Sequence, residues 1–143
     1  MKKLIASKPL FAVLLCVCVV LGCNRWSSSP TATFKAFFEA QKKKDVEAIK
    51  KTLSKASVAL LEKAAKAQNK SLDAAIAEGF ASGSPTEEMP ETRNEKIDGD
   101  NATLEVQDTS TKKWETMYFV KEDRDWKVAL DKTMEELLKK LGK

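Results

Sequence analysis

The chain has 143 residues and a formal net charge of +4, with 25 Lys and Arg against 21 Asp and Glu. It contains no histidine, which removes the usual general base of hydrolase triads and the commonest protein ligand of zinc. We therefore expect neither a Ser-His hydrolase nor a zinc site. Lys2, Lys3 and Lys8 carry most of the charge excess, so it is no argument for nucleic acid binding.

The N-terminal segment has the build of an export signal. Met1-Lys2-Lys3 is basic, a mostly apolar run extends from Pro9 to Leu21, and the small residue Gly22 precedes Cys23. The apolar run is shorter than the roughly 20 residues that a permanent transmembrane helix needs, so we expect cleavage between Gly22 and Cys23. Removal of residues 1–22 would leave about 120 residues, enough for one domain with a single core.

A cysteine directly after a small residue resembles the lipobox of bacterial lipoproteins, in which a diacylglycerol thioether forms on the cysteine before cleavage. This resemblance makes Cys23 the expected lipidation site, and two or three acyl chains would hold the domain at a membrane. The alternative is an ordinary secreted protein in which Cys23 is an unmodified thiol. Asn24 in place of an Asp implies, by the same resemblance, the outer membrane facing the periplasm, or the outer face of the cell membrane where the source has one membrane.

Residues 23–30 are expected to form the lipidated cysteine and a flexible tether, because the segment after Cys23 is polar, rich in Ser and ends in Pro30. Trp26 interrupts this polarity, and two interpretations stay open. It is either an interfacial aromatic at headgroup level or a ring that folds back on the domain or moves freely. The other cysteines, Cys16 and Cys18, leave with the signal, so residues 31–143 have no thiol with which to form a disulfide.

The first half of residues 31–143 has the apolar periodicity of amphipathic helices. Four helices are predicted before any strand. They are a first helix with Phe34, Phe37 and Phe38 on its buried face, a short second one with Asp45 as N-cap and Val46, Ile49 and Leu53 inward, a third over about 56–68 with Val58, Leu61, Ala64 and Ala65 inward, and a fourth that carries Leu72, Ala75, Ile76, Gly79 and Phe80 and stops near Gly83.

Beyond an exposed loop over 84–92 the apolar period changes to two, which is typical of strands. Short turns between the strands, one of them at Asp98-Gly99, favour an antiparallel sheet. The expected strands cover 93–97, the run with Ala102, Leu104 and Val106, the run from Trp114 to Val120, and the run with Trp126, Val128 and Leu130. Helices followed by strands predict a single α+β domain over residues 31–143.

The C-terminal tail returns to helical spacing. Asp131 is its expected N-cap, and four apolar residues share one face: Met134, Leu137, Leu138 and Leu141. This stripe is larger than a lone surface helix usually exposes to water, so it must be buried on something. Because the link from Leu130 is short, we expect the helix to pack on its own domain, the alternative being a partner-binding element.

Three stretches of the chain resemble a family of uncharacterised bacterial lipoprotein domains, a lumazine-binding-like domain of unknown function in the nuclear-transport-factor-2-like superfamily. They are Ser29-Pro30-Thr31 through Phe37-Phe38, Lys44-Asp45-Val46, and Asp125-Trp126-Lys127-Val128. The resemblance implies N-terminal helices packed against a curved antiparallel sheet in a cystatin-like cone, with the tail as an extra C-terminal helix. It covers core and turn residues, so it concerns the fold far more than an activity.

The same resemblance implies a small-molecule pocket in the mouth of the cone, for which the candidate residues are Phe38, Trp114 and Tyr118. Some members of the superfamily are enzymes with a pocket Asp as base. In this chain the acids fall in loops, turns and polar helix faces, so we expect no catalytic residue, cofactor or metal site. The Asp98-Gly99-Asp100-Asn101 run lacks the spacing and the closing Glu of an EF-hand, which favours a tight turn over a calcium loop.

These observations predict a membrane-anchored lipoprotein of the cell envelope that is a non-catalytic binding or scaffolding module. The alternative is an enzyme with a small-molecule pocket in the mouth of the cone. The expected partners are the membrane, through the N-terminal lipid, and an unidentified small ligand or envelope protein. The lysines at 42–44 are read as a solvated helix end or, alternatively, as a basic patch for anionic headgroups.

Overall fold

The structure is a computed structural model that describes residues 29–81 and 88–142. The predicted signal segment, Cys23, Trp26 and Gly83 lie outside these residues, as does part of the loop expected over 84–92. The helices that come first are α1 (Pro30–Lys42), α2 (Val46–Thr52), α3 (Lys55–Ala67) and α4 (Leu72–Ala81). They are followed by β1 (Thr92–Asp98), β2 (Asn101–Gln107), β3 (Trp114–Glu122), β4 (Asp125–Val128) and a last helix, α5 (Leu130–Leu141).

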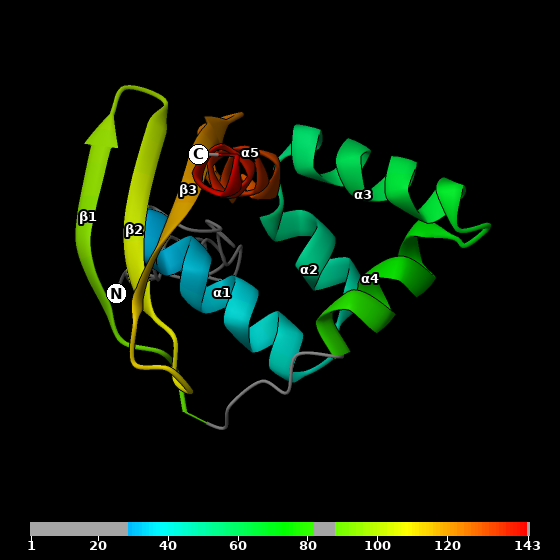
Figure 1. Ribbon diagram of the computed structural model, residues 1–143, viewed down its shortest axis with the longest axis horizontal. Helices are drawn as coiled ribbons and strands as arrows, with labels where there is room; N and C mark the ends of the chain where they lie inside the picture. The colour runs from blue at the N-terminus through cyan, green and yellow to red at the C-terminus, as the bar shows by residue number, and fades with distance from the viewer. Residues whose placement is uncertain (1–28, 82–87, 143) are drawn as a thin grey trace, which may run out of the picture.

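The four strands of the described chain form one open antiparallel sheet in the order β1-β2-β3-β4. The helices α1 to α4 lie on one side of it, with α1 nearest the sheet (Figure 1). The predicted α+β class is therefore confirmed. The outer strand β1 is almost entirely exposed, and its pairing with β2 shifts register between Arg93 and Lys96, which marks a β-bulge.

The helix α1 begins earlier than predicted, because Ser29 and Pro30 start it rather than end a tether. The Ser29 side chain accepts a hydrogen bond from the backbone N–H of Ala32 at 3.1 Å, as an N-cap does. Pro30 occupies the first turn, where a missing N–H costs nothing. The three aromatic residues expected on the buried face are indeed buried: Phe34, Phe37 and Phe38.

The next helices start at side-chain caps. Asp45 accepts from the backbone N–H of Ala48 at 2.9 Å and begins α2, as predicted. Ser54 caps α3 in the same way, and the helix begins at Lys55, one residue before the predicted start. On α3 the alanine that faces the core is Ala65, while Ala64 is exposed, so the expected inward stripe is wrong at that position.

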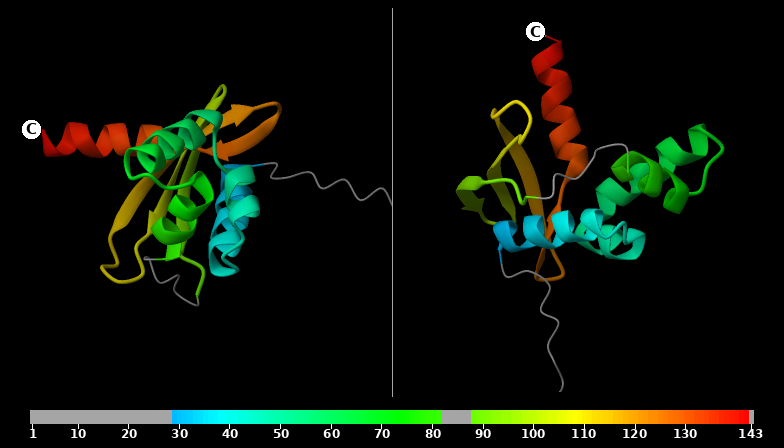
Figure 2. Two further views of the ribbon diagram at one scale, coloured as in Figure 1. Left: turned by 90° about the vertical axis from the view of Figure 1, so that its right-hand side faces the viewer. Right: turned by 90° about the horizontal axis from the view of Figure 1, so that it is seen from below.

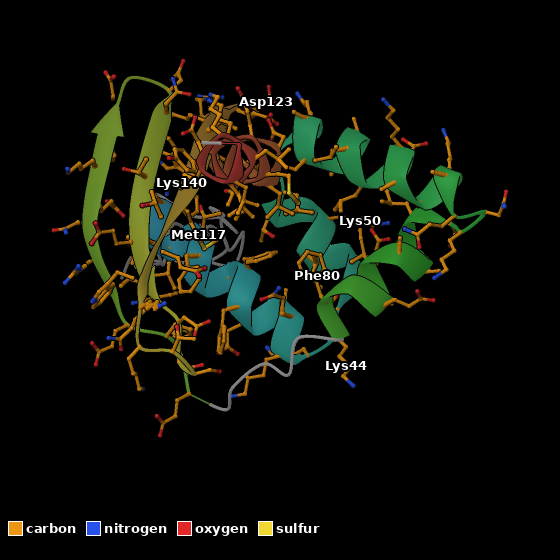
Figure 3. All side chains as sticks on the ribbon, in the orientation of Figure 1. Lys44, Lys50, Phe80, Met117, Asp123 and Lys140 are labelled. Carbon is orange, nitrogen blue, oxygen red and sulfur yellow. The ribbon has the colours of Figure 1, made fainter. Side chains whose placement is uncertain are left out.

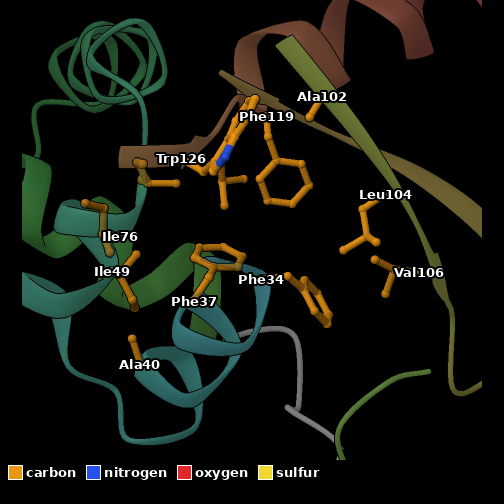
Figure 4. Close-up of a cluster of buried hydrophobic side chains, with 12 residues drawn as sticks. Phe34, Phe37, Ala40, Ile49, Ile76, Ala102, Leu104, Val106, Phe119 and Trp126 are labelled. Carbon is orange, nitrogen blue, oxygen red and sulfur yellow. The ribbon is translucent and has the colours of Figure 1, made fainter. Parts of the chain in front are cut away.

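The core lies between α1 and the inner face of the sheet (Figure 4). On β2, Ala102, Leu104 and Val106 point inward and alternate with more exposed residues, as the sequence predicted. On β3 the inner face carries Phe119 and Met117, because these residues pair with Ala102 and Leu104. Residues from α2, α4 and β4 and the residue directly after α2 complete the cluster, among them Ile49, Leu53, Ile76, Trp126 and Val128.

The hairpin between β3 and β4 turns through two residues with positive φ, Asp123 at 51° and Arg124 at 74°. Neither residue is a glycine, although this left-handed region favours one. The turn also holds the start of α3. The Lys55 backbone N–H donates to the Glu122 carboxylate at 3.1 Å, and the Lys55 ammonium pairs with Asp123 at 3.0 Å.

A cluster of two serines fixes the start of α5. The Ser57 hydroxyl accepts a hydrogen bond from the Leu130 backbone N–H at 2.8 Å and lies 2.9 Å from the Asp131 carboxylate. Ser54 lies 3.3 Å from the same carboxylate, and both serines are buried. Asp131 was predicted to be the N-cap of this helix, and that prediction is wrong. Asp131 lies in the first turn of α5, which begins after Ala129 without a side-chain cap.

Beyond its first turns, α5 projects away from the rest of the described domain (Figure 2). No residue of α5 is buried. Met134, Leu137, Leu138 and Leu141 are 51%, 50%, 61% and 74% exposed. The expectation that the tail packs on its own domain is therefore wrong. Leu130 and the serine contacts attach the helix, and none of the other described residues covers its apolar stripe.

The packing of α1 predicts a large effect of truncating its aromatic face. Phe37→Ala should lower the free energy of unfolding by about 3–5 kcal/mol, the usual range for a buried aromatic side chain changed to Ala. Phe37 also makes an edge contact with Phe80, with ring centroids 5.5 Å apart. Lys35→Ala, at an exposed position of the same helix, is the matched control. Equal thermal melting of the two variants would place α1 outside the core.

The strained hairpin predicts a stabilising substitution. Arg124→Gly should raise the free energy of unfolding by about 0.5–1 kcal/mol, because glycine removes the cost of the left-handed conformation and loses only part of that gain to chain entropy. Asp123→Gly relieves the same strain but removes the ion pair with Lys55, so its gain should be smaller. Chemical denaturation of both variants measures the difference, and a destabilised Arg124→Gly variant would contradict the expectation.

Candidate functional site

A cavity of about 320 Å³ opens where α1 and the end of α4 meet the inner face of the sheet. We call it the aromatic pocket. Residues from α1, α4, the segment before β1, and the β2–β3 hairpin line it. They are Phe34, Phe37, Phe38, Gln41, Gly79, Phe80, Pro90, Val106, Gln107, Asp108, Thr109, Glu115 and Met117. This volume lies at the small end of the range for small-molecule sites.

Four phenylalanine rings give the aromatic pocket its apolar wall. The rings of Phe34 and Phe38 lie 6.4 Å apart between centroids on α1, and Phe37 meets Phe80 edge to face. Helical spacing places the α1 rings here, since residues three and four apart share a face. Phe80 and Met117 approach the same pocket from α4 and β3 (Figure 3).

The rim of the aromatic pocket is polar and acidic. Gln41, Gln107, Asp108, Thr109 and Glu115 contribute amide, hydroxyl and carboxylate groups, and no Lys or Arg is among the described residues that line it. An acidic rim on an apolar wall favours a ligand that is mostly apolar and carries a hydrogen-bond donor or a positive charge.

Asp108 serves the turn that follows β2 as well as the rim. Its carboxylate accepts from the backbone N–H groups of Thr111 at 2.6 Å and Ser110 at 2.9 Å. These hydrogen bonds hold the pKa of Asp108 below its ordinary value, because they favour the charged form of the carboxyl group. The bond from the Thr111 backbone N–H has the largest effect. A general base needs a pKa raised toward neutrality. Asp108 therefore shapes the hairpin and supplies negative charge.

The structure separates the three residues that the sequence grouped as a pocket. Phe38 lines the aromatic pocket. Trp114 and Tyr118 lie on the outer face of the sheet, because their strand neighbours Met117 and Phe119 point inward. Trp114 stacks under the Arg93 guanidinium, 3.9 Å from the ring centroid. Tyr118 lines a separate shallow hollow at the other end of the sheet.

Among the residues of the aromatic pocket that sequence reasoning missed are Gly79, Phe80, Glu115 and Met117. Alternation along β3 contained the signal for two of them, since Glu115 and Met117 share the period-two face of Phe119. The larger aromatic rings of Trp114 and Tyr118 favoured the wrong face. Gly79 and Phe80 depend on the approach of α4 to α1, which no local pattern reveals.

Two alternative sites from the sequence also have structural outcomes. The Asp98–Asn101 run forms a two-residue hairpin turn in which Gly99 has a φ of +57°, as predicted. Across residues 29–81 and 88–142, no three His, Cys, Asp or Glu side chains cluster closely enough to hold a metal ion. Two lysines that follow the run at 42–44 form ion pairs within the domain, Lys50 with Asp73 at 2.9 Å and Lys55 with Asp123 at 3.0 Å.

Comparison with known proteins adds no relative to this description. No protein-family model matches the chain, and the searches of curated proteins and of solved structures found no match either. Among the described helices, none has the length and the apolar content that crossing a bilayer requires.

Proposed function

We propose that the chain is a lipid-anchored lipoprotein of the bacterial cell envelope whose domain is a non-catalytic binding module. In this proposal Cys23 carries the lipid, and α1 begins seven residues later at Pro30. An extended segment of that length spans at most about 25 Å. The domain would then stay close to the membrane surface, most simply the outer membrane on its periplasmic side.

The aromatic pocket is the observation that supports binding. Its wall of four phenylalanines and Met117, with Gln41, Gln107 and Glu115 at the rim, suits a small apolar ligand bearing a donor or a cation. In the fold we propose, α1 is the axis and the open sheet is the wall of a nuclear-transport-factor-2-like cone. The aromatic pocket then corresponds to the mouth of the cone.

The enzyme alternative finds little support in this geometry. The superfamily chemistry needs an acid and a Tyr that face the same ligand, but Tyr118 lies on the face of the sheet opposite to the aromatic pocket. The pKa of the rim acid Asp108 is shifted downward by its turn hydrogen bonds. Neither group is placed for proton abstraction.

Gly79 offers a direct test of ligand binding. It lines the pocket, and a Cβ added there meets nothing within 4 Å. Gly79→Phe should fill part of the cavity and weaken binding of a neutral naphthylamine fluorescent probe at least tenfold. Gly79→Ala is the matched control, since it adds only a methyl group and favours the helix by about 0.5–1 kcal/mol. Fluorescence titration of the chain without residues 1–23 measures both variants.

The rim charge gives the second arm of the same test. Glu115→Gln should weaken the binding of a cationic apolar probe several-fold and leave the binding of the neutral probe unchanged, because only the charged probe is attracted by the carboxylate. If the neutral probe binds equally well to Gly79→Phe and Gly79→Ala, the aromatic pocket is not its binding site.

The anchor is tested separately at the cysteine. Cys23→Ser should abolish incorporation of a labelled fatty acid, because only the thiolate accepts the lipid. The precursor should then stay unprocessed or the domain should be released from membranes. Cys18→Ser, within the predicted signal, should behave like the wild type. Equal labelling of the Cys23→Ser variant and the wild type would disprove lipidation at this residue, whatever the result at the pocket.

A further inference from the structure

The most exposed apolar surface of the described domain is one face of α5. Leu130, Met134, Leu137 and Leu141 follow one another in steps of four, three and four residues, the spacing of a coiled-coil seam. Leu138 widens the seam on one side. Leu130 packs against the core of its own domain, but Met134, Leu137 and Leu138 are between 50% and 61% exposed and Leu141 is 74% exposed. From Met134 onward the stripe has the spacing of a helix–helix contact, and the described residues do not cover it.

The direction of α5 is fixed before any partner binds. Ser54 and Ser57 at the start of α3 hold Asp131 and the Leu130 backbone N–H, and the helix then leaves the domain (Figure 2). Lys139 pairs within the helix with Glu135 at 2.9 Å and Glu136 at 2.8 Å, which supports helical order in the projecting turns. A preformed helix loses little conformational entropy when it docks.

The charges of α5 have a sign symmetry about the centre of its stripe. The run Met134-Glu135-Glu136-Leu137-Leu138-Lys139-Lys140-Leu141 reads apolar, two acids, two leucines, two lysines, apolar. Reversal of its direction exchanges acids for lysines and leaves the apolar positions in place. An antiparallel copy of the same helix is therefore complementary to it in both shape pattern and charge.

We propose that α5 is a dimerisation helix that pairs antiparallel with α5 of a second copy of this chain. The two-fold axis passes between Leu137 and Leu138, so that Met134 lies opposite the partner's Leu141. Such an interface is isologous, with each contact made twice. Figure 2 shows that α5, beyond its first turns, projects away from the sheet and from α3, which leaves room for a second helix along its outer part.

The proposed pairing also supplies a partner for Lys140. At 3.6 residues per turn, Glu136 and Lys140 lie on the same flank of the stripe, and in the antiparallel register each Lys140 lies one residue, about 1.5 Å of helix rise, from the level of the partner's Glu136. Within the described residues Lys140 forms no ion pair. Two symmetric Lys140–Glu136 pairs between copies would flank the apolar seam, as charges beside a coiled-coil seam do when they set helix orientation.

The same charges disfavour the other occupants of the stripe. A parallel pair of α5 helices would place acids level with acids and lysines level with lysines, which is destabilising. At an anionic membrane surface, Glu135 and Glu136 would oppose the headgroups that Lys139 and Lys140 attract, whereas membrane-surface helices have polar faces rich in Lys and Arg. An antiparallel second copy places opposite charges beside both the acidic and the basic half of the helix.

The contact is short, so the dimer should be weak in solution. Two helices that overlap over about two turns bury less than the roughly 1,200 Å² of a stable interface, which suggests a dissociation constant on the order of 10 μM. Flanking ion pairs are screened by salt, so dimerisation should weaken further as the ionic strength rises.

Charge exchange between two differently tagged full-length copies tests the pairing in non-ionic detergent. Wild-type copies should co-purify, and sedimentation should give the mass of a dimer. Glu136→Lys paired with itself, and Lys140→Glu paired with itself, should each associate about tenfold more weakly. A mixture of the two variants should recover association, because each Lys then meets a Glu. The Glu136→Lys/Lys140→Glu double variant should pair with itself like the wild type.

The apolar seam is tested with a matched pair of leucines. Leu137→Asp should abolish association, whereas Leu60→Asp, an exposed leucine on α3, should preserve it. Circular dichroism and thermal melting verify that both variants are folded. Wild-type copies that stay monomeric, an unaffected Leu137→Asp variant, or charge variants that fail to recover on mixing would each overturn the proposal. Loss of vesicle binding by Leu137→Asp, with no dimer in the wild type, would assign the stripe to a membrane instead.

Discussion

The fold depends on the contact between the aromatic face of α1 and the inner face of the sheet. Phe34 and Phe37 belong to the same buried cluster as Leu104, Phe119 and Trp126, so one helix packs against three strands that lie far from it in the chain. Burial of this kind supplies most of the free energy that opposes chain entropy in a small domain. The same rings form the wall of the aromatic pocket at the end of the sheet, which ties the candidate site to the stability of the core.

Much of this architecture could be predicted because its signals are local. The apolar steps of Phe34, Phe37 and Phe38, the cap at Asp45 and the alternation of Ala102, Leu104 and Val106 each depend on a few adjacent residues. The face of β3 could not be assigned in this way. Both of its faces carry large apolar side chains, and only the pairing of Phe119 with Ala102 decides which face meets α1.

The pocket and the last helix show the limit of local reasoning in different ways. Phe38 lines the pocket because its place on α1 sets its surroundings, but Gly79 and Phe80 reach the pocket through the path of α4. The helix α5 begins two residues after β4 ends, so its first turn stays against the domain. Direction is a tertiary property, and it comes from Ser54 and Ser57, seventy residues or more before Asp131, so the sequence pattern of the tail could not show that the helix turns outward.

The bulge in β1 has a consequence for how the chain behaves when many copies share one surface. An unpaired strand edge is a template on which another sheet can grow, and confinement to a membrane plane would bring such edges together often. In β1 the register shift between Arg93 and Lys96, the left-handed Asn94 and the exposed charges beside it interrupt the row of backbone groups. The edge of the sheet is thereby a poor template for open-ended polymers along β1.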